Sequence, residues 1–216
     1  MPRIHITPVV LNLMILNALV FVALNINMEL LYPYFILQKS DLIISPRIIQ
    51  LPDGHFYHPV FQPVQLVTAF FSHEAIWHIF MNMFALYNFG VVLETVMGAR
   101  RFLFAYLTIG VVSTAIVAFL DPSPYPMLGA SGALFGMAVL YAWYFPKAQM
   151  GIIFLPFRFA IGKFMIGAAV LSAGLIIAEY VTGKSMGGIS HFGHLSGMVV
   201  GFVYLHIDKL RKITKR

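Results

Sequence analysis

The run FLFAYLTIGVVSTAIVAFL at residues 102–120 contains no charged side chain and follows directly after Arg100 and Arg101. A helix needs about 20 mostly apolar residues to cross the hydrocarbon core of a bilayer, so this run predicts a membrane-spanning helix. Five other stretches have the same character, and together they predict six spans at residues 7–26, 76–97, 102–120, 127–145, 164–180 and 190–207. We therefore expect an all-α polytopic membrane protein, in which a single domain over residues 1–216 forms a bundle of six transmembrane helices.

The composition of the whole chain supports a membrane protein and excludes several other classes. Of its 216 residues, 60% are hydrophobic and 10% are charged, with a mean hydropathy of +0.84. Soluble domains carry roughly a quarter charged residues, so this chain lacks the polar side chains that would cover a soluble core. Disordered chains, soluble secreted domains and nucleic-acid-binding arms are thereby excluded. The absence of cysteine also excludes disulfides, thiolate chemistry and cysteine-ligated zinc.

The positions of the basic residues predict how the spans are oriented. The net charge is +6, and in a six-span arrangement only Lys39, Arg47 and Lys184 of the 14 basic residues fall on one side of the membrane. The other 11 fall on the opposite side: Arg3, Arg100, Arg101, Lys147, Arg158, Lys163, Lys209, Arg211, Lys212, Lys215 and Arg216. Cytoplasmic segments are enriched in Lys and Arg, so both termini are predicted to be cytoplasmic. Residues 208–216 are interpreted as a basic cytoplasmic tail that contacts membrane lipids rather than nucleic acid. The long segment 27–73 is then an external loop that lies along the outer interface.

Polar side chains inside membrane spans are costly and usually functional. Four of those in the predicted spans stand out: His78, Asn82, Ser131 and His194. His78 and Asn82 are four residues apart and share one face of the second span. The second, fourth and sixth spans run in the same direction, and each of the four side chains lies near the outer end of its span. At about 1.5 Å per residue they occupy one layer, roughly 5–10 Å deep. This convergence predicts a polar site that opens to the external face.

Glycines predict that the fourth and sixth spans approach each other closely. Gly132 and Gly136 form one small-xxx-small pair, and Gly197 and Gly201 form another. His194 precedes Gly197 by three residues and therefore lies on the same glycine-lined face. The histidine of the sixth span is expected at hydrogen-bond distance from the serine of the fourth span.

A serine beside a histidine is the minimum for an activated alkoxide nucleophile. In this interpretation Ser131 attacks a peptide carbonyl, while His194 takes the hydroxyl proton and returns it to the leaving amine. None of the eight Asp and Glu residues lies at this depth on a neighbouring face, so the site is predicted to be a dyad. Phe135, one turn after Ser131, is expected to pack against the imidazole. His78 and Asn82, together with the Ser131 backbone N–H, are expected to bind the oxyanion.

Three motifs carry these residues: Gly-x-Ser-Gly at 129–132, His-x-x-x-Asn at 78–82, and His-Leu-Ser-Gly-Met-Val-Val-Gly at 194–201. Together they resemble the nucleophile motif, the oxyanion pair and the catalytic-histidine helix of the rhomboid family of intramembrane serine proteases. The resemblance implies cleavage of transmembrane protein substrates in or beside their membrane segment, through an acyl-enzyme and with no metal or other cofactor. It further implies that substrate helices enter sideways and that the loop 180–189 acts as a cap.

Three features depart from patterns that are common in that family. The first external loop has no Trp-Arg pair, Phe135 stands where some members have tyrosine, and Gly193 stands where alanine is common. None of these departures removes a catalytic group. The compact six-span core resembles that of bacterial members, which predicts a bacterial plasma membrane protein.

Some histidine patterns have competing interpretations. The histidines of His73-Glu74-x-x-x-His78 are five residues apart, whereas a zincin motif needs four to place both on one face. His191 and His194 have the spacing of a metal pair, which is disfavoured because no cysteine or carboxylate lies nearby. His191 is also the rival for the role of general base. His194 is preferred because it is in phase with Gly197 and Gly201.

Glu94 is an acidic residue near the inner end of the second predicted span. Arg100 and Arg101 follow it closely in the sequence. A structural ion pair is therefore predicted here in preference to a proton relay.

Two non-enzymatic functions are the alternatives to a protease: a small transporter, or a non-catalytic rhomboid-like protein that binds client helices. A transporter is expected to show internal repeats and interrupted helices, which the sequence lacks. A non-catalytic relative is expected to lack Ser131 or His194, and both are present. The sequence identifies no particular substrate and indicates no oligomeric state.

Overall fold

The computed structural model describes residues 5–39, 49–50, 56–57, 60–123, 125–151 and 158–213. Its helical elements are α1 (Pro8–Ile26), α2 (Met28–Phe35), α3 (Gln65–Thr68), the 3-10 turn η1 (Ala69–Phe71), α4 (Ile76–Ala85), the π-helical turn η2 (Leu86–Gly90), α5 (Val91–Met97), α6 (Ala99–Leu120), α7 (Ser131–Tyr144), α8 (Ile161–Thr182) and α9 (His191–Ile213). Two short antiparallel ribbons pair β1 (Ile49–Gln50) with β2 (Phe56–Tyr57) and β3 (Gln149–Gly151) with β4 (Arg158–Ala160). The predicted all-α class is confirmed.

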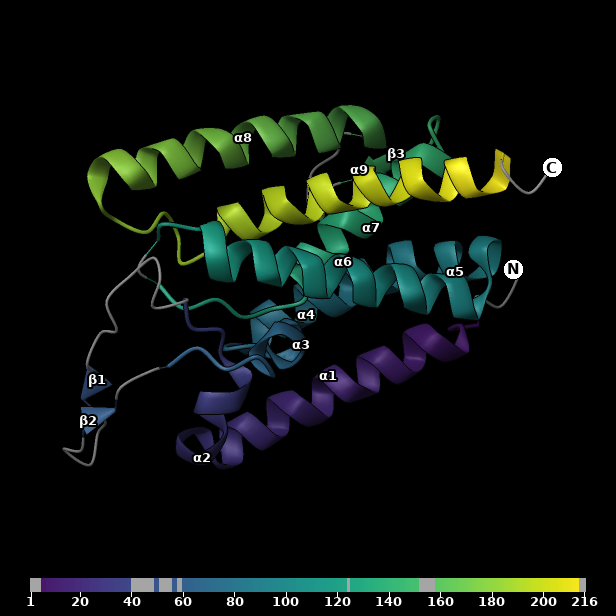
Figure 1. Ribbon diagram of the computed structural model, residues 1–216. Coiled ribbons are helices and arrows are strands. Elements are labelled where there is room, and N and C mark those ends of the chain that lie inside the picture. The colour runs from purple at the N-terminus through teal and green to yellow at the C-terminus, as the bar shows by residue number, and fades with distance from the viewer. Residues whose placement is uncertain are drawn as a thin grey trace.

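Helices occupy the stretches that the sequence marks as membrane spans. Within the described residues, α1, the continuous stretch Ile76–Met97, α6 and α8 are long and apolar enough to cross a bilayer, and α7 is a shorter apolar helix. Helix α9 occupies the sixth predicted span. Figure 1 shows a bundle with α1 and α8 at opposite edges and both ends of the chain at the same end of the molecule. The protein is therefore a polytopic helical membrane protein.

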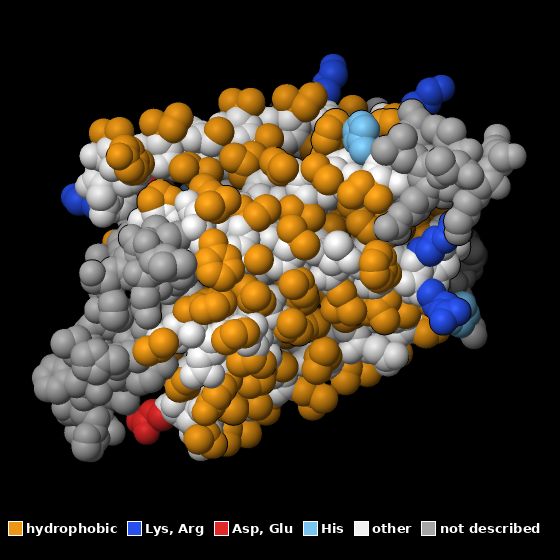
Figure 2. Space-filling model, in the orientation of Figure 1, with side chains coloured by type: hydrophobic (Ala, Val, Ile, Leu, Met, Phe, Trp, Pro, Cys, Tyr) orange, Lys and Arg blue, Asp and Glu red, His pale blue; other side chains and the backbone are white. Residues whose placement is uncertain are grey.

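The outside of the bundle is apolar. Large hydrophobic side chains are exposed on several helices, such as Leu19 on α1 (63% exposed), Phe104 on α6 (59%) and Val170 on α8 (68%). Figure 2 shows apolar side chains across the middle of the molecule, with most of the visible Lys and Arg side chains at the end near the termini. A helical surface with this much exposed apolar area suits contact with lipid rather than water.

The fourth span begins later than the sequence predicts. Helix α7 starts at Ser131, whereas the predicted span starts at residue 127. The preceding segment is not helical, because Met127 pairs with Leu37 in an antiparallel bridge and Gly129 has a φ of +114°. A positive φ of this size favours glycine. Ser131 is therefore the first residue of its helix.

Helices α7 and α9 are in backbone contact, as the glycine spacing predicts. A Cβ atom added to Gly197 would overlap the carbonyl oxygen of Gly132, and one added to Gly201 would lie 2.5 Å from the carbonyl oxygen of Gly136. Only glycine fits at such a contact, since it allows two helix backbones to touch. The starts of the two helices are consequently held next to each other, at the level of the predicted site.

The start of α1 is held by an acidic side chain from α5. The Glu94 carboxylate is buried and accepts hydrogen bonds from the backbone N–H groups of Val9 (3.0 Å) and Val10 (2.9 Å). The first N–H groups of a helix have no acceptor within the helix, and a negative charge there also favours the helix dipole. The predicted ion pair with Arg100 or Arg101 is wrong: in the described part of the chain, this carboxylate caps a helix instead.

The end of the bundle away from the termini is fastened by contacts between two connecting segments. Lys39 forms an ion pair with Asp121, and both side chains are buried. Burial lowers the pKa of Lys39, and the charge of Asp121 opposes that shift. Together with the Leu37–Met127 bridge, this pair ties the segment after α2 to the segment that leads into α7. Three parts of the predicted external loop, residues 40–48, 51–55 and 58–59, lie outside the described residues.

Candidate active site

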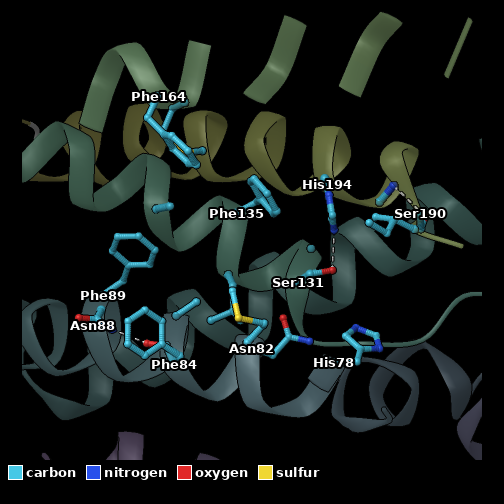
Figure 3. Close-up of a pocket in the computed structure, with 18 of the residues that line it drawn as sticks. His78, Asn82, Phe84, Asn88, Phe89, Ser131, Phe135, Phe164, Ser190 and His194 are labelled. Carbon is cyan, nitrogen blue, oxygen red and sulfur yellow. Dashed lines mark hydrogen bonds between the residues drawn. The ribbon is translucent and has the colours of Figure 1, made fainter. Parts of the chain in front are cut away.

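Ser131 and His194 meet at the adjoining starts of α7 and α9. The Ser131 Oγ lies 2.8 Å from Nε2 of His194, within hydrogen-bond distance, as Figure 3 shows. When Nε2 carries no proton, the hydroxyl donates to it, which is the arrangement that a general base needs. The two residues are 63 positions apart in the sequence, so the glycine contact between the helices brings them together.

Packing fixes the orientation of the His194 ring. Phe135 stacks on it with the ring centroids 4.3 Å apart and the planes inclined by 28°. His191 meets the same ring edge-on at 6.3 Å, but its own Nε2 is bonded to the carbonyl oxygen of Met186 at 3.0 Å. The structure thus brings His194 to the serine, while His191 is engaged with the loop before α9.

His78 and Asn82 face the serine from α4 across a gap that Gly129 leaves open. A Cβ atom at Gly129 would lie 2.8 Å from Nε2 of His78 and 3.7 Å from Nδ2 of Asn82. Figure 3 shows both side chains opposite Ser131 on the neighbouring helix. The Asn82 amide nitrogen is buried and has no hydrogen-bond partner among the described residues. Since an unpaired buried donor is costly, these donors are suited to an oxygen atom that a ligand supplies.

His73 lies behind His78 and outside the spanning helix. Its ring is 2% exposed and meets the His78 ring edge-on, with the centroids 5.0 Å apart. Burial, together with the neighbouring His78, lowers the pKa of His73 to about 3. This ring is therefore neutral at ordinary pH and acts as packing behind the His78 side chain.

A cavity of about 810 Å³ lies between α4, η2, α7 and α8 and contains the Ser131–His194 pair near one end. Residues Gly187 to Ser190 of the loop before α9 border it there. The loop is held in place at Met186, whose N–H donates to Oε1 of Glu179 at 2.8 Å and whose carbonyl contacts His191. Among the residues that the structure describes, no three His, Asp or Glu side chains gather in a metal-binding arrangement. The serine, the imidazole and the facing donors together line this end of the cavity.

Comparison with known proteins connects this arrangement to a family. The family model of the Rhomboid domain matches residues 60–210, which include every residue of the site. The chain belongs to the rhomboid family. This confirms the family resemblance, and with it an intramembrane setting and a kinship with proteases.

Curated rhomboid proteins from several organisms are similar to this chain. Rhomboid protein 1, mitochondrial, of Saccharomyces cerevisiae is 30% identical over 152 residues, covering 65% of this chain and 40% of the relative. Presenilin-associated rhomboid-like protein, mitochondrial, of Homo sapiens is 32% identical over 146 residues, covering 65% and 36%. Rhomboid protease GluP of Bacillus subtilis is 32% identical over 140 residues, covering 64% and 24%. The chain thus spans less than half the length of these rhomboid relatives.

The rhomboid site contains polar residues that sequence reasoning missed. Ser190 caps the start of α9, because its Oγ accepts the N–H of Gly193 at 3.1 Å, and it also lines the cavity. A serine just before an apolar helix is a capping signal that was available in the sequence. Asn88 lines the cavity in the middle of the second span, where its amide was equally visible as a polar residue among apolar ones.

Proposed function

We propose that this rhomboid is an intramembrane serine endopeptidase that cleaves transmembrane protein substrates. Ser131 is the nucleophile and His194 is the general base and then the general acid. The observation that carries this proposal is the 2.8 Å contact between the two side chains inside a cavity bordered by membrane-spanning helices.

The reaction has two stages. The Ser131 Oγ attacks the peptide carbonyl carbon while His194 Nε2 removes the hydroxyl proton, which forms a tetrahedral intermediate with a negatively charged oxygen. The imidazolium then protonates the leaving amine, the C–N bond breaks, and the acyl group stays on the serine as an ester. A water molecule, deprotonated by the imidazole, hydrolyses that ester and restores the free hydroxyl.

The donors facing the serine support the charge on the intermediate. Asn82, His78 and the backbone N–H of Ser131, at the start of a helix, surround the space beside the Oγ. Removal of one such donor typically raises the barrier by about 3 kcal/mol. His194 has no carboxylate partner in the described residues, and the stacked Phe135 holds the ring in place of one.

The bias of basic residues and the position of both termini at one end favour cytoplasmic termini, with the dyad near the external face. The similar proteins include mitochondrial and bacterial rhomboids, so the bacterial plasma membrane stays a prediction. In this proposal an extended stretch of a protein substrate enters the cavity of about 810 Å³, and its remaining span lies in the surrounding lipid.

The test is cleavage of a single-span model substrate by the purified protein in liposomes, with each active-site variant paired with a matched control. Ser131→Ala is expected to abolish cleavage, whereas Ser196→Ala is expected to retain it, because Ser196 on α9 only bonds the carbonyl of Phe192. His194→Ala is expected to abolish cleavage, whereas His206→Ala is expected to retain it, because the exposed His206 bonds Phe202 on its own helix.

Labelling with a serine-reactive phosphonate gives an independent readout. The wild-type protein is expected to be labelled at Ser131, and the Ser131→Ala variant to remain unlabelled. Cleavage at the wild-type rate by Ser131→Ala would overturn the proposal. A protein that binds the substrate with unchanged affinity but neither cuts it nor takes the label would instead be a non-catalytic client-binding rhomboid.

A further inference from the structure

The cavity extends well past the dyad along the second span. Its wall on that side is a helical stripe with two residues per turn, formed by Trp77, His78, Met81, Asn82, Phe84, Ala85, Asn88 and Phe89. Phe135, Ala138 and Tyr141 of α7 line the opposite wall, and Phe164 of α8 lies at the side. Figure 3 shows Asn88 and Phe89 at one end of this cavity, with His78 and Ser131 at the other.

Asn88 and Tyr141 are polar side chains that lie at one depth in this mainly apolar stretch, which Gln149 of β3 also lines. Asn88 follows His78 by ten residues on one wall, and Tyr141 follows Ser131 by ten residues on the other. At about 1.5 Å per residue, both lie roughly 15 Å deeper than the dyad. The rings of Phe89 and Tyr141 are in contact, with centroids 5.3 Å apart, which confirms that the two walls are level there.

The amide of Asn88 is costly where it lies, since it is in the middle of a membrane span. Its side chain is exposed within the described structure, and one N–H donates to the Phe84 carbonyl oxygen at 2.7 Å. An amide carries a second N–H and a carbonyl acceptor, so this bond uses only part of its capacity. The residue also belongs to the π-helical turn η2, an irregularity that often accompanies functional positions in helices.

We propose that Asn88, with Tyr141 opposite it, is a specificity-determining position that hydrogen-bonds a polar side chain in the substrate's spanning segment. This inference rests on the proposed function. The preferred substrate carries Asn, Gln, Ser or Thr below the cleaved bond, on the side that continues into the membrane. A depth of roughly 15 Å corresponds to about ten residues if that part of the substrate is helical and about five if it is extended.

The continuity of the cavity identifies the occupant as the substrate. A chain whose carbonyl is held at Ser131 must continue either out of the membrane or down the same cavity, between η2 and α8. On the α8 side the cavity is lined by Ile161, Phe164 and Met165. The deeper stretch is lined mainly by Phe, Ala and Met side chains, which match an apolar substrate segment.

The experiment measures cleavage of single-span substrates whose N-terminus lies on the dyad side. The half of the span after the cleavage site is made of Leu and Ala, and one Asn is moved through it one residue at a time. Hydrogen bonds between membrane helices change an equilibrium by roughly three- to twentyfold. The wild-type rhomboid is therefore expected to cut one substrate of the series about three to twenty times faster than the Leu/Ala parent, with Asn about five to ten residues after the cleaved bond.

Variants on the enzyme side locate the effect. In Asn88→Leu the ratio between the best Asn substrate and the parent is expected to fall to about one, whatever happens to the absolute rates. Asn25→Leu is the matched control, because Asn25 is also an exposed span residue whose amide bonds the carbonyl four residues earlier, Phe21, at 2.8 Å. The control is expected to keep the ratio. Asn88→Ala serves as a second variant that also lacks the amide.

A flat profile with the wild-type protein, or an Asn-dependent peak that persists in Asn88→Leu and Asn88→Ala, overturns the proposal. A binding measurement distinguishes a failure of this recognition proposal from a failure of the proposed protease function. If the wild-type protein cuts none of the substrates, photo-crosslinking of the same series to the Ser131→Ala protein decides, and the same Asn-dependent ratio in crosslinking yield is expected. Equal crosslinking along the series would overturn the recognition by Asn88 in that case as well.

Discussion

Glycines of the same kind serve opposite purposes in α7–α9 and in α8. On α7 and α9 each glycine of the two pairs faces a backbone atom of the other helix, and at Gly136, Gly197 and Gly201 a methyl group has no room. On α8, Gly162, Gly167 and Gly174 face open space. Helix α8 is also loosely packed, since 17% of its apolar stretch is buried, against 44% for α6. The dyad is thus built on the closest helix contact, while the cavity wall is one of the least packed helices.

The largest effect that would test this comparison is expected from a single methyl group. Gly197→Ala forces α9 away from the Gly132 carbonyl, which separates Ser131 from His194. We expect a loss of about 1–3 kcal/mol in the free energy of unfolding and a loss of most cleavage. Gly167→Ala on α8 is the control and is expected to be neutral or to stabilise by about 0.5–1 kcal/mol. Equal effects of the two substitutions, measured by unfolding in mild detergent, would contradict the division between the helices.

A second comparison sets two phenylalanines of the cavity against each other. Phe135→Ala removes the ring that stacks on His194, so we expect kcat to fall by about tenfold with little change in KM. Phe164→Ala removes a ring from the α8 wall and is expected to change KM more than kcat, because it touches the substrate path rather than the imidazole. Steady-state kinetics on one substrate separates the two results, and a shared kcat defect would argue that both walls orient the dyad.

The buried His73 is expected to make the stability of the protein depend on pH. Its pKa of about 3 lies below the ordinary value of 6.5, so between these values the unfolded chain binds the proton more readily than the folded protein. The free energy of unfolding therefore keeps its full value above pH 6.5 and decreases as the pH falls toward 3. In chemical unfolding at a series of pH values, His73→Gln and His73→Leu are expected to lose less stability on acidification than the wild type. If the free energy of unfolding depends on pH in both variants as it does in the wild type, the buried imidazole is not the source of that dependence.

The smallest effect is expected at His191, the first residue of α9, which contacts the loop that follows α8. His191→Ala removes the contact with the Met186 carbonyl but leaves the Ser131–His194 pair in place. Loss of one hydrogen bond of about 1 kcal/mol predicts a change in the cleavage rate of about two- to fivefold. Phosphonate labelling of Ser131 is expected to persist in His191→Ala and to disappear in His194→Ala. Loss of labelling in both would make His191 part of the catalytic unit.

The spans and the meeting of the dyad residues were predictable because each depends on a local pattern. Apolar runs of membrane length mark the helices whatever their neighbours are. The spacing of Gly197 and Gly201 relative to His194 indicates a helix face, and the structure places that face on α7. The contact of Phe135 with the imidazole follows from one helical turn, and it is present at 4.3 Å.

The features that escaped the sequence depend on partners far away in the chain. Helix α7 begins only at Ser131 because Met127 pairs with Leu37 in an extended conformation. A short apolar run gives the same sequence pattern whether it is helical or extended. Glu94 was assigned to nearby arginines because they are adjacent in sequence, while its real partners lie 84 and 85 residues earlier. Neither long-range pairing leaves a signature in residue spacing.

The cap that Glu94 places on α1 has a consequence for biogenesis. The first peptide N–H groups of α1 enter the membrane environment during synthesis before the second span, which carries their acceptor, has been made. Until that span is made, the carboxylate that accepts from Val9 and Val10 is not yet present. The start of α1 can therefore be capped by Glu94 only after residue 94 has been synthesised, so this contact forms late in the assembly of the bundle.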